Sequence, residues 1–97
     1  MAYDPGAIDA TLAAAVGDDP ALIAELRLAF LEGAKAAVTT LTRAENGTAW
    51  IDAALRLKGL AASFGAVRLM AVAGDAAIAP VGDVETLRKV RRAVERL

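Results

Sequence analysis

The chain has 97 residues, the length of one domain, and 57% of them are hydrophobic while only 4% are aromatic. Its net charge of −1 provides no general positive field to hold nucleic acid. The absence of cysteine and histidine excludes disulfides, thiolate metal sites and imidazole catalysis. Much of the apolar content is alanine, the best helix former. We therefore expect one all-α domain over residues 1–97 that is not an enzyme and holds no metal or cofactor.

Neither a membrane span nor a signal peptide is expected. The longest nearly uncharged stretch, residues 69–82, contains Asp75 and Pro80 and is shorter than the ~20 residues of a bilayer crossing. Asp4 and Pro5 come early, and no basic region precedes an apolar segment. These features predict a cytoplasmic location.

Turn and capping residues divide the chain into five predicted helices. The second and longest begins where the acidic pair Asp18-Asp19 is followed by Pro20, a strong helix-start signal. Thr48 is the expected N-cap of the third helix, and Asp83 that of the fifth. The predicted helices cover about residues 7–16, 20–43, 49–63, 66–79 and 84–97.

Each predicted helix has one apolar face, and the connections are short, which favours antiparallel neighbours. We therefore predict an up-down antiparallel four-helix bundle with a short additional N-terminal helix. The side chains expected in its core are Leu26, Phe30, Leu41, Trp50, Leu57, Phe64, Leu69 and Leu87. The inward faces also include Leu22, Ala29 and Val84. Leu28, Leu31 and Val38 lie off the main face of the long helix, and they either pack under the N-terminal segment or form a homodimer seam.

The segment 53–66 resembles the signature of histidine-phosphotransfer (HPt) domains. In that family a histidine is followed two, three and four residues later by leucine, lysine and glycine, and a further glycine lies near the helix end. These places are occupied here by Leu57, Lys58, Gly59 and Gly65. The phosphoacceptor position holds Leu55. The acidic start of the long helix, Gly47 and Trp50 extend the resemblance, which covers Ile8 to about Ala77.

The resemblance implies a docking surface without the atom that carries phosphate. In the family, the lysine neutralises phosphate oxygens, and the glycine lets a receiver domain approach closely. Leu55 has no lone pair that accepts phosphate, and no other histidine exists. We therefore expect a signalling adaptor or inhibitor that binds a response-regulator receiver domain or a histidine kinase. Lys58 either contacts such a partner or is a solvated remnant of a competent ancestor.

The helical wheel indicates, independently of the resemblance, that Leu55 faces outward. If Leu57 points into the core, Leu55 lies ~160° away on the helix. It then aligns with other small or apolar side chains, flanked by charges, as at a protein-binding patch. The predicted partner-binding residues are Ile51, Asp52, Leu55, Arg56, Lys58, Gly59 and Ala62. Alternatively, the N-terminal helix covers this strip, or the strip is simply tolerated as exposed leucines often are.

Two further interpretations concern other surfaces. The last helix is basic, but no aromatic residue interleaves its positive charges, so a solvated outer face is favoured over nucleic-acid or membrane binding. A different function remains open, in which the chain is a dimerising helical module with no phosphorelay role.

Overall fold

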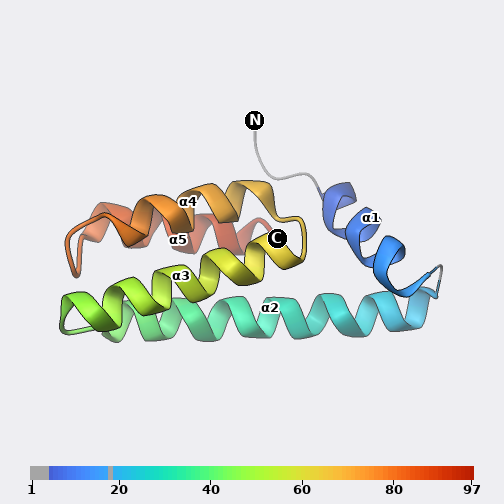
Figure 1. The fold of residues 1–97 in the computed structure, drawn as a ribbon, viewed down its shortest axis with the longest axis horizontal. Helices are drawn as coiled ribbons and strands as arrows, with labels where there is room; N and C mark the ends of the chain where they lie inside the picture. The colour runs from blue at the N-terminus through green and yellow to red at the C-terminus, as the bar shows by residue number, and fades with distance from the viewer. Residues whose placement is uncertain (1–4, 18) are drawn as a thin grey trace.

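The computed structural model describes residues 5–17 and 19–97, and this part of the chain forms five helices and no strand (Figure 1). The helices are α1 (Pro5–Val16), α2 (Pro20–Arg43), α3 (Gly47–Ser63), α4 (Val67–Ala77) and α5 (Val84–Glu95). The predicted all-α class is confirmed. Asp18, half of the predicted acidic cap, lies outside the described residues. In the described part, no helix has both the length and the apolar character that a membrane crossing needs.

Side-chain caps begin α2 and α5 where the sequence predicts. The Asp19 carboxylate accepts hydrogen bonds from the amides of Ala21 and Leu22, at 3.1 and 3.2 Å. The Asp83 carboxylate accepts from the hydroxyl of Thr86 at 2.6 Å and from its amide at 2.9 Å. The hydroxyl bond first, and then the amide bond, lowers the pKa of Asp83 below its ordinary value.

The start of α3 corrects the predicted cap. Asn46, not Thr48, is the N-cap, because its side-chain oxygen accepts a hydrogen bond from the Ala49 amide at 2.9 Å. The helix therefore includes Gly47 and Thr48 and begins two residues earlier than expected. Asparagine and threonine are both good caps, and Asn46 is the one placed to reach the third amide of the helix.

The end of α3 depends on Gly65, which adopts a left-handed backbone with φ +71°. The amide of Ala66 donates to the Ala61 carbonyl at 2.9 Å, and the amide of Gly65 donates to the Ala62 carbonyl at 3.3 Å. This pair of bonds is the Schellman arrangement, which strongly favours glycine at the left-handed position. It turns the chain directly into α4.

The four helices α2 to α5 run in alternately opposite directions along the long axis of the molecule (Figure 1). In sequence order, α2 contacts α3, α3 contacts α4, α4 contacts α5, and α5 returns to contact α2. Within the described residues, α1 contacts α2 and no other helix. Ile8 and Leu12 are buried, so α1 contributes to the core.

Most of the predicted core is confirmed. Phe30, Leu41, Trp50, Leu57, Leu69 and Leu87 are buried, whereas Leu26 and Phe64 are partly buried against the core. The rings of Phe30 and Phe64 stack with their centroids 4.8 Å apart. The indole nitrogen of Trp50 donates to the Ala76 carbonyl at 2.7 Å, which joins α3 to the end of α4.

Four expected burial positions are wrong. Leu22, Ala29 and Val84 are exposed, and so is Leu28, which does not pack under α1. Ala29 lies ~100° around the helix from Phe30, outside the buried face. With 24 residues, α2 is about 36 Å long, and its first turns extend past the end of α3 (Figure 1). Val84 opens α5, and Glu85 beside it is exposed as well.

Candidate docking face on the third helix

All seven predicted partner-binding residues lie on α3, and all seven are exposed; we call this set the docking face: Ile51, Asp52, Leu55, Arg56, Lys58, Gly59 and Ala62. Leu55 has 49% of its surface exposed, whereas Leu57, two residues away, has 0%. The outward orientation of Leu55 that the wheel predicts is therefore confirmed. An apolar side chain as large as leucine is left in solvent at the centre of the face.

The N-terminal helix does not cover the docking face. Among the described residues, α1 contacts α2 alone, and Ile51 and Leu55 keep 42% and 49% of their surfaces exposed. The alternative in which α1 shields this strip is wrong, because Ile51 and Leu55 stay exposed while α1 packs near the first turns of α2 (Figure 1). The apolar strip stays open to a second molecule or to water.

A groove of about 460 Å³ runs between α2 and α3 along one edge of the docking face. Its lining residues are Gly33, Ala36, Leu55, Arg56, Gly59, Leu60 and Ser63. A Cβ atom on Gly33 would meet the Cδ2 atom of Leu60 at 3.2 Å, so the glycine allows Leu60 to pack closely against α2. Small residues on the α2 side therefore leave room for a shallow depression beside Leu55.

Sequence reasoning missed four of these lining residues: Gly33, Ala36, Leu60 and Ser63. A helical wheel shows only one helix at a time, so it does not reveal which residues of α2 border α3. The signal that existed was the pair of small residues at positions 33 and 36, one turn apart on α2. Only the pairing of α2 with α3 shows that they border the docking face.

Gly59 has no packing role that requires glycine. It lies in the interior of α3, it is exposed, and a Cβ atom there would meet no other atom within 4 Å. Glycine inside a helix costs about 0.5–1 kcal/mol relative to alanine. Gly59 therefore makes α3 less stable than alanine would, and its lack of a side chain leaves open surface next to Leu55.

The two cations of the docking face lie on opposite sides of the apolar strip. Arg56 lines the groove on the α2 side. Lys58 extends over α4, where its Nζ atom lies 3.8 Å from the position that a Cβ atom of Gly74 would occupy. Neither cation forms an ion pair with a described residue. Both positive charges are available to an acidic partner, and Asp52 is the only acidic member of the face.

The docking face has no group that accepts a phosphoryl transfer through histidine chemistry. Leu55 stands at the matching position, and the whole sequence lacks histidine. Ser63 supplies the hydroxyl group in the groove, and its Oγ atom donates a hydrogen bond to the Gly59 carbonyl at 3.0 Å. No general base adjoins it among the lining residues, so it is not an activated nucleophile. The docking face offers apolar surface, two cations and a groove, which suit it to binding a partner.

Comparison with protein-family models, curated proteins and solved structures gives no match to this chain. The resemblance to HPt domains therefore rests on the residues that carry it, chiefly Leu57, Lys58, Gly59 and Gly65. In the structure, Leu57 anchors α3 in the core, Gly65 ends the helix, and Lys58 and Gly59 are exposed.

Proposed function

We propose that this chain is a degenerate HPt domain that binds a receiver domain or a histidine kinase of a two-component system. It acts in the cytoplasm as an adaptor or inhibitor of the phosphorelay and carries no phosphate itself. The observation that carries this proposal is Gly59, a solvent-exposed interior helix glycine that packing does not require, beside the exposed Leu55. A glycine in this setting is useful to a partner that approaches the backbone closely.

The helix contacts support the fold that the proposal needs. Contacts between α2 and α3, α3 and α4, α4 and α5, and α5 and α2 fit an up-down antiparallel four-helix bundle, with α1 as the additional helix. In such a bundle, α3 shows one face to the core and the opposite face to solvent. Leu57 lies on the buried face of α3, and Leu55 lies on the exposed face.

The docking face has the composition of a protein interface. Full burial of a leucine or isoleucine contributes about 1.5–3 kcal/mol, so covering the half that Ile51 and Leu55 still expose contributes on the order of 1 kcal/mol each. Arg56 and Lys58 add positive charge on either side, which complements the acidic pocket that receiver domains present and accelerates association. Compared with a phosphate-carrying domain, this face offers more apolar contact and no reactive atom.

Binding to purified receiver domains and kinase domains from the same cell tests the proposal. We expect one or more of them to bind, and Leu55→Asp to weaken that binding at least tenfold, because a carboxylate would have to be desolvated at the centre of the interface. Leu28→Asp is the matched control, since Leu28 is also an exposed leucine but lies on α2, outside both the docking face and the lining of the groove. A failure of every receiver and kinase to bind the wild-type chain contradicts the proposal.

The exposed apolar strip also favours a second candidate, in which the chain is a dimerising module without a phosphorelay role. Two copies of α3 can pair through Ile51 and Leu55 around a twofold axis, with each strip covering the other. Sedimentation velocity at micromolar concentration separates the two functions. A dimer that Leu55→Asp dissociates supports the module, whereas a monomer that binds a receiver domain supports the adaptor.

A further inference from the structure

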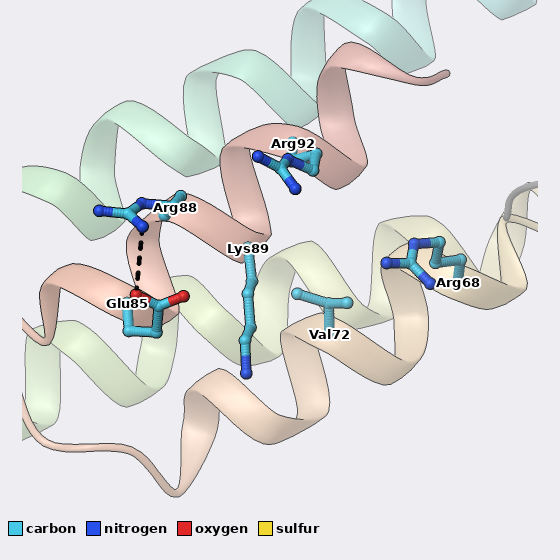
Figure 2. A pocket seen from close by; sticks show the side chains of 6 residues that line it. All are labelled: Arg68, Val72, Glu85, Arg88, Lys89 and Arg92. Atoms are coloured by element: carbon cyan, nitrogen blue, oxygen red, sulfur yellow. Dashed lines mark ion pairs between the residues drawn. The ribbon is translucent and has the colours of Figure 1, made fainter.

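A second surface, between α4 and α5, gathers positive charge that the docking face does not use. A pocket of about 230 Å³ lies there, and its lining residues are Arg68, Val72, Glu85, Arg88, Lys89 and Arg92. Figure 2 shows Arg68 and Val72 extending from α4, and Lys89 and Arg92 extending from α5. Residues from two consecutive helices therefore line one depression.

The charge of this pocket is not balanced by the protein. Arg88 pairs with Glu85 at 3.5 Å on the same helix, so these two side chains neutralise each other (Figure 2). No described residue forms an ion pair with Arg68, Lys89 or Arg92. Asp83 caps α5 through its hydrogen bonds with Thr86 but keeps its negative charge, and that charge attracts Lys89. Arg68 and Arg92 are therefore the two pocket cations that no described carboxylate opposes.

Arg68 is the member that points to a ligand. Its side chain makes no hydrogen bond with a described residue, and its Nε atom is buried without a partner. That atom has no accessible surface, so a ligand in the pocket does not reach it. The terminal nitrogens of Arg68 are neither buried nor hydrogen-bonded to a described residue, so an anion can bind them without breaking an existing bond. Arginine is suited to this because its planar fork binds two anionic oxygens at once.

We propose that the pocket between α4 and α5 binds a phosphorylated anion. A phosphate monoester carries about −1.5 to −2 charges at pH 7, which matches the two positive charges of Arg68 and Arg92. The volume is below the roughly 300–1,000 Å³ of pockets that enclose a drug-sized molecule, which fits a charged group better than a whole nucleotide. The inference is independent of the docking face, which lies on other helices.

Titration with inorganic pyrophosphate, followed by calorimetry and by amide chemical shifts, tests the proposal. We expect binding at one site, with shifts confined to α4 and α5, and at least tenfold weaker binding by Arg68→Gln/Arg92→Gln. Lys89→Gln, which changes an exposed side chain and leaves the core intact, should weaken binding severalfold. Arg96→Gln is the control, because Arg96 lies on the last turn outside the pocket and should change binding less than twofold.

Vesicles of phosphatidylcholine, with and without phosphatidylinositol bisphosphate, show where the phosphate comes from. Vesicle binding that pyrophosphate displaces and Arg68→Gln/Arg92→Gln abolishes assigns the site to a lipid headgroup. Pyrophosphate binding without vesicle binding assigns it to a free phosphorylated compound. The proposal is overturned if pyrophosphate does not bind, or if Arg96→Gln weakens binding as much as Lys89→Gln. It is also overturned if an oligonucleotide binds while pyrophosphate does not, since that shows an extended surface and no pocket.

Discussion

Replacing Trp50 by phenylalanine tests how α3 and α4 are held together. The indole nitrogen lies in the core and donates to the Ala76 carbonyl at 2.7 Å, a bond that phenylalanine cannot make. Its loss removes about 1 kcal/mol. The Ala76 carbonyl still accepts from the Ala79 amide at 3.1 Å, so the further penalty for an unpartnered acceptor does not apply. The smaller ring loses burial and leaves a cavity, which removes about 1–2 kcal/mol more.

Trp50→Phe should therefore lower the free energy of unfolding by about 2–3 kcal/mol, and the Tm by roughly 10–20 °C for a domain of this size. Urea denaturation followed by far-UV circular dichroism measures this, because Trp50 is the sole tryptophan and its fluorescence disappears with it. Leu28→Ala, at an exposed site, should change stability by less than about 0.5 kcal/mol. A loss no larger than this control would refute the reasoning that the indole contact joins the two helices.

Three further changes have defined outcomes. Gly59→Ala should raise the free energy of unfolding by about 0.5–1 kcal/mol, as thermal denaturation will show, and should weaken receiver binding because the new methyl group occupies open surface. Leu57→Ala should lower that free energy by about 2–5 kcal/mol, whereas Leu55→Ala should change it by less than about 0.5 kcal/mol in the same urea experiment. The pKa of Asp83 is lowered in the folded state by Thr86, so its stabilising effect is full above the ordinary pKa of 3.8 and is lost as the pH falls through the lower folded value. The difference in urea midpoint between wild type and Asp83→Ala should accordingly be constant near neutral pH and shrink on acidification below pH 3.8.

Features that are set by residues close together in the sequence, such as helix caps and helix faces, were predictable. The start of α2 follows from Asp19 and Pro20, whose capping chemistry acts within one turn. Trp50 and Leu57 were assigned to the core because they share one face of α3, and that face is a local property. The two candidate caps of α3 lie two residues apart, and only the hydrogen bond from the Ala49 amide to Asn46 decides between them.

Features that depend on how long neighbouring helices are, or on which helices pair, were not predictable. Leu22 belongs to the apolar pattern of α2 but is exposed, whereas Ile23 beside it packs against the core. The bond from Trp50 to the Ala76 carbonyl spans 26 positions, and no periodicity encodes it. Similarly, Arg68 and Arg92 reach one pocket only because α4 and α5 pack side by side. For the candidate site, the exposed face of α3 was predictable, and the groove beside it was not.

The arrangement of the helices makes the two proposed sites separable. The groove beside Leu55 lies between α2 and α3, and the basic pocket lies between α4 and α5. Because contacts run from α2 to α3 to α4 to α5 and back to α2, these two seams do not share a helix. A partner on the docking face therefore leaves the basic pocket open, and an anion in the pocket leaves Leu55 exposed. The nearest physical link is Lys58, which reaches from α3 over Gly74 of α4, the helix that also holds Arg68. If an anion in the pocket alters receiver binding, the change should be small, and Lys58→Ala should remove it.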